Sequence, residues 1–501
     1  MMQAEPVAAA RDSMTVTPYP ALPREWGRQA RWLLSLSILL AVAVGAGTAV
    51  NPLLALLALS LLVAVAAVWK WPPLAAYALI GLTPLTAGIS RGTALPFVRV
   101  NEAIALVVGV ALVTRFIVQL RTGQLPKLRL GSVEVSMVLL AVCSSVVPLW
   151  WMTVRQRVMT GDDLLYGLVL WKYFGLYVLI RMSVSTDRQI LRCLRISVVA
   201  ACVVAVLAIL QSLGLFGVPR ILAIWYPAFG FNGATNTFSA RGSSTLGLPA
   251  ATADLMLFNL AIVSGVWMRS RRHRALLVPA AALLVLAALS AGEFSSAIGL
   301  VVAVIAIAVV TNSARLLAIF VPAGLVSSQL LQPVFAARLS GFQSVTGLPV
   351  SWIGRLQNLQ SYFWPTLFSH WNFLLGVRPS ARIPVASQVT GFVWIESGYT
   401  WLLWGGGIPL FAAFVFFVVA TAKRGWDAAH KNLGAAGVAG IASFVAIIVT
   451  AVLMAFDPHL TYRGSADLMF VLIALATPRD RRAATARAQI TAAQVAEEVS
   501  V

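Results

Sequence analysis

Basic side chains that could hold a phosphate recur between the apolar runs of this sequence. They are Arg241, Arg355, Arg378, Arg382 and Arg463. A guanidinium stays charged and presents a fork of donors that matches phosphate oxygens in pairs, so several arginines together suit a pyrophosphate. The alternative for any one of them is an interfacial anchor or an ordinary loop cation.

Carboxylates near these arginines include a candidate general base. Glu396 stands at the edge of an apolar run, where a carboxylate is costly unless it faces a cavity or a partner. The pKa of such a carboxylate could suit proton removal from a hydroxyl. An equal alternative is that Glu396 caps the N-terminus of the following helix and complements its dipole. Asp457 and His459 form a second polar group with Arg463, although a tight turn explains Asp457 and Pro458 equally well.

The elements that must position these residues are membrane-spanning helices. Of 501 residues, 59% are hydrophobic and 11% are charged, with a mean hydropathy of +0.86. A soluble domain is about 45–50% apolar and about 25% charged, so lipid must cover much of this chain. A bilayer needs roughly 20 apolar residues per helix, which predicts an all-α polytopic integral membrane protein with about 12–14 transmembrane helices. The predicted spans are 32–49, 53–69, 73–89, 101–119, 133–151, 164–181, 196–216, 246–268, 276–292, 295–311, 315–333, 396–421, 434–455 and 464–477.

Charge predicts the orientation. Most of the 37 Lys and Arg residues fall in segments on the same side as the N-terminal tail. The positive-inside rule therefore places both termini in the cytoplasm. Much of the net charge of +20 is then an orientation signal, and we expect no nucleic-acid partner.

This topology divides the chain into tails, two groups of helices and a long outer loop. The segments are a cytoplasmic tail at 1–31, transmembrane helices at 32–333, a non-cytoplasmic loop at 334–395, transmembrane helices at 396–477 and a cytoplasmic tail at 478–501. Within the loop, apolar residues recur every three or four positions from Arg355 to Leu375, which predicts an amphipathic helix at the interface. His370 falls inside that helix. The alternative is a structural lid with aromatic anchors.

Three motifs follow one another between residues 235 and 425. They are Ser239–Pro249 with its Arg-Gly turn, Gly354–Trp364 with the turn Leu374–Val377, and Glu396–Tyr399 with the Gly-rich run Trp404–Pro409. In order, spacing and expected outer location they resemble the O-antigen polymerase and O-antigen ligase superfamily of bacterial envelope glycan assembly. The N-terminal half is similar only in being hydrophobic.

The resemblance implies transfer of a glycan from a polyprenyl-pyrophosphate carrier to the sugar hydroxyl of another lipid-linked unit. Arg241 and Arg355 would contact the leaving pyrophosphate, and Glu396 would act as the base. Residues expected to bind substrate are Arg378, Arg382, His370, Tyr399, Asp457 and Arg463. Expected partners are membrane lipid and a flippase or chain-length regulator, and no metal or cofactor is expected.

Two departures from the family pattern bear on this assignment. The stretch Ser290–Ser296 lacks the Arg of a Ser-Arg pair that family members often carry in a middle span, and Glu396 stands where ligases are associated with a His. The second departure favours a polymerase over a ligase.

Other functions remain open. A ligase and a lipid-linked oligosaccharide flippase are the main alternatives, but transporters commonly contain internal repeats, and no convincing repeat relates the halves of this chain. A multi-span transferase that uses polyprenyl-phosphate sugars typically has acidic residues in its first outer loop, which here is only Val50–Pro52. A non-enzymatic scaffold would leave the outer arginines unexplained.

Orientation is tested with single cysteines in a background without the three native ones. Arg272→Cys should resist an impermeant thiol reagent in intact cells, while Gln360→Cys should react, because charge places them on opposite sides. Labelling of position 272 with position 360 silent would reverse the topology.

Overall fold

The computed structural model describes the chain from residue 52 to residue 477, with gaps. The described residues are 52–93, 98–121, 130–226, 231–232, 237–238, 241–270, 274–314, 317–332, 334, 336, 349–386 and 391–477. The chain falls into two units, 1–64 and 65–501. Of the first unit only the beginning of helix α2 (Pro52–Lys70) is described, and the predicted span at 32–49 lies outside the described residues.

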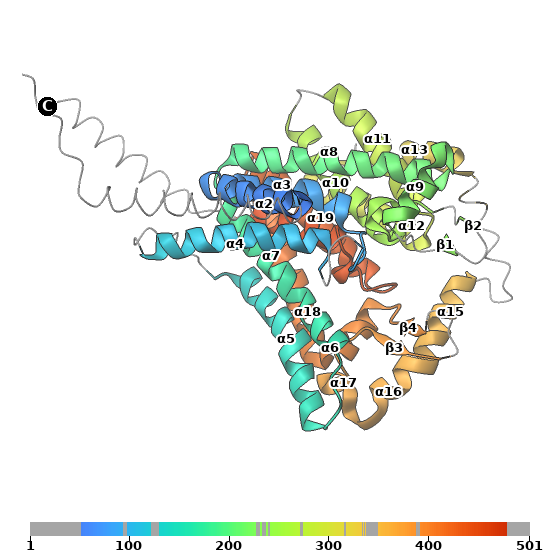
Figure 1. The fold of residues 1–501 in the computed structure, drawn as a ribbon. Helices are drawn as coiled ribbons and strands as arrows, with labels where there is room; N and C mark the ends of the chain where they lie inside the picture. Colours follow the sequence, from blue (N-terminus) through green and yellow to red (C-terminus); the bar gives the residue numbers. More distant parts are fainter. Residues whose placement is uncertain are drawn as a thin grey trace, which may run out of the picture. The chain divides into compact units, whose positions relative to one another are not determined.

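Helices make up most of the second unit (Figure 1). Those that coincide with predicted spans are α3 (Pro73–Thr86), α4 (Val100–Arg121), α5 (Ser132–Val154), α6 (Gly161–Gly167) with α7 (Val169–Ser183), α8 (Asp187–Ser212), α10 (Pro249–Arg269), α11 (Arg274–Ser290), α12 (Phe294–Thr311), α13 (Leu317–Leu330), α18 (Gly398–Lys431), α19 (Ala435–Leu453) and α20 (Ser465–Ala476). Shorter elements between them are η1 (Leu215–Gly217), α9 (Val218–Trp225), η2 (Ser244–Leu246), α15 (Val350–Asn358), η5 (Leu359–Phe363), α16 (Trp364–Phe368), η6 (Ser369–Trp371), α17 (Asn372–Leu375) and η7 (His459–Thr461). Two short antiparallel hairpins pair β1 (Phe231–Asn232) with β2 (Thr237–Phe238) and β3 (Arg382–Pro384) with β4 (Phe392–Trp394).

Eight helical stretches of the described chain are long and apolar enough to cross a membrane. They are Val100–Arg121, Ser132–Val154, Gly161–Ser183, Asp187–Ser212, Pro249–Arg269, Phe294–Thr311, Gly398–Lys431 and Ala435–Leu453. Shorter apolar helices accompany them, among them α3, α11 and α20. Large apolar side chains remain exposed on their outer faces, such as Leu106 and Val110 on α4, where lipid would cover them. The prediction of an all-α protein that crosses a membrane many times is confirmed.

The centre of the helical packing is formed by α10 and α19, which are apolar on nearly all sides. Both pack against α8, α12 and α20, and α19 also lies along α18. A helix that is hydrophobic all round belongs in a core, and small residues allow close approach there. A side chain on Gly265 of α10 would meet Val438 of α19, and one on Gly425 of α18 would meet Phe444 of α19.

The end of α10 is tied to the turn between α18 and α19. The Arg269 guanidinium donates to the backbone carbonyls of Ala429, Asn432 and Gly434. Carbonyls at a helix C-terminus have no partner within the helix and carry partial negative charge, so a cation in this position satisfies them. The basic residue therefore has a structural role as well as an orienting one.

The amphipathic helix predicted from Arg355 to Leu375 is wrong in its boundaries. The helical segment begins at Val350, passes through the π-helical turn η5 and ends at Phe368. The π turn joins the Trp364 N–H to the Leu359 carbonyl, just before Pro365, which has no N–H to donate. His370 and Trp371 then take left-handed backbone angles, which stop a helix. His370 therefore lies beyond the helix, on an exposed turn.

A break in α18 receives the loop that precedes β3. Gly407 has φ +65° inside α18, and Pro409 follows it. The Trp404 carbonyl, freed from regular helical bonding, accepts from the Val377 N–H at 2.7 Å and from the Arg378 N–H at 3.3 Å. Gly376 has φ +89°, and its Cα packs against the backbone of Gly406. The glycines at 405–407 and at 376 thus allow the backbone of α18 and the loop before β3 to contact each other.

Gly407→Ala should destabilise the fold. A left-handed backbone costs an L-residue about 1–2 kcal/mol, and the added methyl group would collide with the Leu374 carbonyl. Gly175→Ala on α7 is the matched control, because nothing lies within 4 Å of the methyl group that it would add. Thermal unfolding in detergent should show a lower midpoint only for Gly407→Ala, and equal midpoints would mean that the break does not depend on glycine.

Candidate functional site

Five charged side chains from separate parts of the sequence form one group, here called the Arg355 cluster. Its members are Arg241, Glu293, Arg355, Glu396 and Asp457. Arg355 comes from α15, Glu293 precedes α12, Glu396 precedes α18 and Asp457 follows α19. Loops between different spans therefore meet at this place.

Arg355 is held between two carboxylates. Its Nη1 lies 2.6 Å from Asp457 Oδ2, and its Nε lies 3.8 Å from Glu396 Oε1. The same Nη1 also faces the Phe456 carbonyl at 3.4 Å. One turn further along the helical segment, Asn358 donates to Glu396 Oε2 at 3.3 Å. The guanidinium thus joins the start of α18 to the turn after α19.

Arg241 stands at the edge of the same cluster. Its Nη1 lies 3.8 Å from Glu293 Oε1, and the Gly242 N–H donates to the Ser290 carbonyl at 2.9 Å, which anchors this turn to the end of α11. Burial lowers the pKa of Arg241 and the nearby Arg355 cation lowers it further, whereas Glu293 raises it. The two arginines predicted to act together are therefore brought together.

Electrostatics distinguish the carboxylates. Burial raises the pKa of Asp457 to about 6, against the opposing pull of Arg355 and His459. Burial disfavours the Arg355 cation, yet Asp457 and Glu396 outweigh burial and raise the pKa of Arg355. Asp457, assigned from sequence to substrate binding, is thus the carboxylate whose pKa best suits exchange of a proton near neutral pH.

Glu396 does not cap α18. Ser397 occupies that position, and its hydroxyl accepts from the Thr400 N–H at 3.3 Å. The described partners of the Glu396 carboxylate are Arg355 and Asn358. The alternative interpretation of Glu396 as a helix cap is therefore wrong, while its role as a base stays a prediction.

A buried histidine–aspartate pair adjoins the Arg355 cluster. His459 Nδ1 lies 2.7 Å from Asp254 Oδ2, and both side chains are 1% exposed. The His459 N–H donates to the Asp457 carbonyl at 2.8 Å, which links the pair to the cluster. Burial opposes the His459 cation, but the Asp254 carboxylate prevails and raises the pKa of His459. Sequence reasoning missed Asp254, although an acidic residue inside a span is itself a signal of function.

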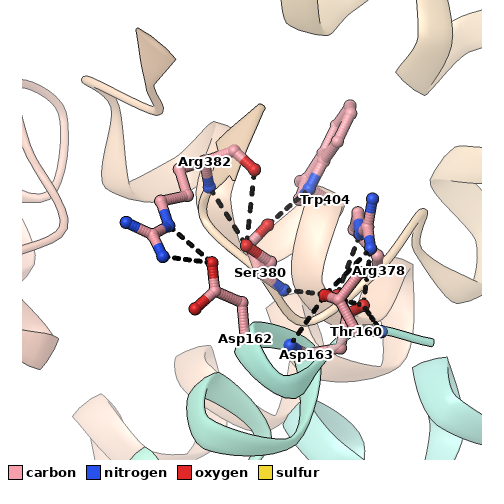
Figure 2. Close-up of polar contacts among 7 residues, drawn as sticks. All are labelled: Thr160, Asp162, Asp163, Arg378, Ser380, Arg382 and Trp404. Carbon is pink, nitrogen blue, oxygen red and sulfur yellow. Dashed lines mark hydrogen bonds and ion pairs between the residues drawn. The ribbon is translucent and has the colours of Figure 1, made fainter. Parts of the chain in front are cut away.

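Arg378 and Arg382 lie at a different place, where their guanidiniums contact the first turn of α6 (Figure 2). Arg378 donates from Nε to Asp163 Oδ1 at 2.9 Å and from Nη2 to Asp163 Oδ2 at 2.5 Å. Arg382 Nε donates to Asp162 Oδ2 at 2.6 Å. The Ser380 N–H also faces Asp163 Oδ1, at 3.3 Å. Both guanidiniums thus already have carboxylate partners, and they fasten the loop before α18 to the Asp162–Asp163 pair.

The remaining predicted substrate-binding residues are dispersed. Tyr399 donates its hydroxyl to the Ala451 carbonyl at 2.7 Å, which joins α18 to α19. The backbone carbonyl of His370 accepts from Arg155 Nη2 at 2.6 Å, and the His370 side chain is exposed. Arg463 belongs to another group of arginines, near Glu102 at the start of α4. Substrate binding by these residues stays a prediction.

In the part of the chain that the structure describes, no group of three or more His, Cys, Asp or Glu side chains is arranged to hold a metal ion. Comparison with models of known protein families finds no match for the sequence. A search of curated proteins likewise finds none that is similar.

Loss of the Asp163 charge should loosen the loop before α18. The Asp163 side chain is fully buried, so Asp163→Asn leaves Arg378 without its counter-charge, and breaking a buried pair costs about 3–5 kcal/mol. Asp162→Asn is the control, because Asp162 is 30% exposed and such a pair contributes about 0–1 kcal/mol. The thermal unfolding midpoint of Asp163→Asn should be well below that of Asp162→Asn. Equal midpoints would mean that the Asp163–Arg378 ion pair does not stabilise the fold.

Proposed function

We propose that this protein transfers a glycan from a polyprenyl-pyrophosphate carrier to the hydroxyl of a second lipid-linked unit. The observation that carries the proposal is Arg355, held between Asp457 and Glu396 with Arg241 nearby, where loops from several membrane spans meet. Guanidiniums that suit a pyrophosphate and carboxylates that suit a base are thereby side by side. The order of the three sequence motifs, which resembles the O-antigen polymerase and ligase superfamily, supports the same class of reaction.

The residues divide the chemistry between them. The acceptor hydroxyl oxygen forms a bond to the anomeric carbon, and the bond from that carbon to the pyrophosphate oxygen breaks with its electron pair. Arg355 and Arg241 stabilise the negative charge that grows on the leaving pyrophosphate. Asp457 accepts the proton of the acceptor hydroxyl, with Glu396 as the second candidate for this role.

The Arg355–Asp457 ion pair links binding to base strength. A bound pyrophosphate competes for the Arg355 guanidinium and loosens its contact with Asp457. Removal of a neighbouring cation raises the pKa of a carboxylate, so the base strengthens when the donor is in place. This coupling would limit proton removal in the absence of donor.

The distribution of Lys and Arg residues suggests on which side of the membrane the Arg355 cluster lies. We place the Arg355 cluster on the non-cytoplasmic face of a bacterial plasma membrane, with both termini in the cytoplasm. Lipid-linked units would then reach the site after a flippase has delivered them, and a chain-length regulator would act on the product. A polymerase is preferred over a ligase because Glu396 stands where ligases are associated with a His.

The transfer activity is tested in liposomes supplied with lipid-linked oligosaccharide on the face that bears the cluster. Growth of the lipid-linked glycan should depend on the protein. Asp457→Asn should lower turnover by roughly 10²–10⁴-fold, because a positioned base is lost. The control Asp427→Asn, near the C-terminal end of α18, should leave turnover unchanged. If units cross the bilayer faster but never grow, the protein is a flippase.

Companion variants separate the roles within the cluster. Arg355→Lys keeps the charge but loses the fork of donors, so most activity should disappear, whereas Arg188→Lys on the exposed first turn of α8 should have no effect. Glu396→Gln with near-normal output would leave Asp457 as the sole base. The value of kcat/KM should also rise with pH through about 6, as Asp457 of the donor-free enzyme loses its proton, and a kcat/KM independent of pH there would contradict its role.

A further inference from the structure

A second group of arginines lies outside the Arg355 cluster, and we call it the Arg99 cluster. It consists of Arg91 and Arg99 in the loop before α4, Glu102 on the first turn of α4, and Arg463 just before α20. Arg91 Nη2 and Arg99 Nη1 lie 3.1 Å and 3.2 Å from Glu102 Oε1. One carboxylate thus serves two guanidiniums directly.

Positive charge in the Arg99 cluster exceeds negative charge. Glu102 is its single acid, against three guanidiniums. The Arg463 guanidinium makes no hydrogen bond or ion pair with any other described residue, and Arg99 Nε is buried without an acceptor among those residues. The chain between Thr93 and Val98 reads Ala-Leu-Pro-Phe and contributes no acid.

Such an excess of partly buried positive charge is costly. Burial and the Arg463 cation lower the pKa of Arg99 to about 10, and burial lowers the pKa of Arg463. A partly buried guanidinium whose donors lack acceptors loses hydration that nothing replaces. An anion would supply the missing acceptors, and the N-terminus of α4 adds favourable partial charge for it.

We propose that the Arg99 cluster binds a phosphate-type anion at a site separate from the Arg355 cluster. The unsatisfied donors of Arg99 and Arg463 match phosphate oxygens, and Glu102 holds Arg91 and Arg99 in place. The phosphate is carried either by a lipid headgroup, since α4 exposes apolar side chains such as Leu106 and Val110, or by a free soluble anion. The site stands whether or not the chain transfers glycans.

The contrast between the two clusters argues for binding rather than catalysis at this one. The Arg355 cluster holds three carboxylates for two guanidiniums, and one of those carboxylates has a pKa suited to proton transfer. In the Arg99 cluster the single carboxylate is occupied by two ion pairs. No carboxylate there is left to act as a base, so the expected role is to hold a charged group.

The test is thermal unfolding of the full chain with two kinds of probe. One arm adds inorganic pyrophosphate in detergent, against sodium chloride of matched ionic strength. The other compares nanodiscs of phosphatidylglycerol with nanodiscs of phosphatidylcholine. The unfolding midpoint should rise in at least one arm, and the arm in which it rises identifies a free anion or a lipid headgroup as the source.

Variants assign any rise to the Arg99 cluster. Arg463→Gln should abolish it, Arg463→Lys should remove most of it, and Arg188→Gln should keep it. Arg355→Lys should also keep it, which separates this site from the Arg355 cluster. A rise that survives Arg463→Gln, or no rise in either arm, would overturn the proposal.

Baseline stability distinguishes a binding site from a structural role. Loss of one of several repelling cations relieves the cluster, so Arg463→Gln without a probe should unfold at a midpoint no lower than that of the unaltered protein. A clearly lower midpoint without a probe would mean that Arg463 supports the fold itself, and the proposal would fail.

Discussion

The bilayer core contains no water to hydrogen-bond with the chain, and the other features of this structure follow from that constraint. Backbone groups in such a medium must pair within their own segment, which selects helices. Ionisable groups are driven to the helix ends or must find partners. Lys172 and Asp467 illustrate this rule, because their charged atoms lie 3.3 Å apart although each belongs to an apolar helix.

Polar chemistry is therefore concentrated where loops meet. The turn between α19 and α20 has a central place among them. Asp457 and His459 face Arg355 and Asp254, whereas Arg463 joins the arginines at the start of α4. A segment of a few residues thus contributes to an acid-rich cluster and to an arginine-rich one, and a change in its backbone would alter both.

The break in α18 connects this chemistry to the membrane part. A regular helix would use the Trp404 carbonyl internally, but here it accepts from Val377 and Arg378. The same loop is fastened to α6 by Arg378 and Asp163. The loop before α18 is thereby held at two points, and Glu396 lies between this loop and the start of α18. Two arginines that would suit a phosphate when considered singly are instead part of this attachment.

The amino-acid sequence was sufficient to predict a helical protein that crosses a membrane many times and roughly where its long helices lie. Apolar length and composition are local properties, and lipid acts on each helix separately, so the eight long apolar helices of the described chain overlap predicted spans. It also singled out Arg241, Arg355, Glu396 and Asp457 as residues of chemical interest. The function assigned to them remains a proposal.

Which of those residues meet depends on how the helices and loops pack together. Arg378 and Arg463 have the same side chain, yet one is bound to Asp163 and the other lies among arginines. Ion pairs here join residues as distant in sequence as Arg378 and Asp163, and no local pattern encodes which loops come together. Helix ends depend on single backbone angles, as at His370 and Trp371. Hydrophobicity places a helix in the membrane, but the packing of helices against one another decides which charges share a site.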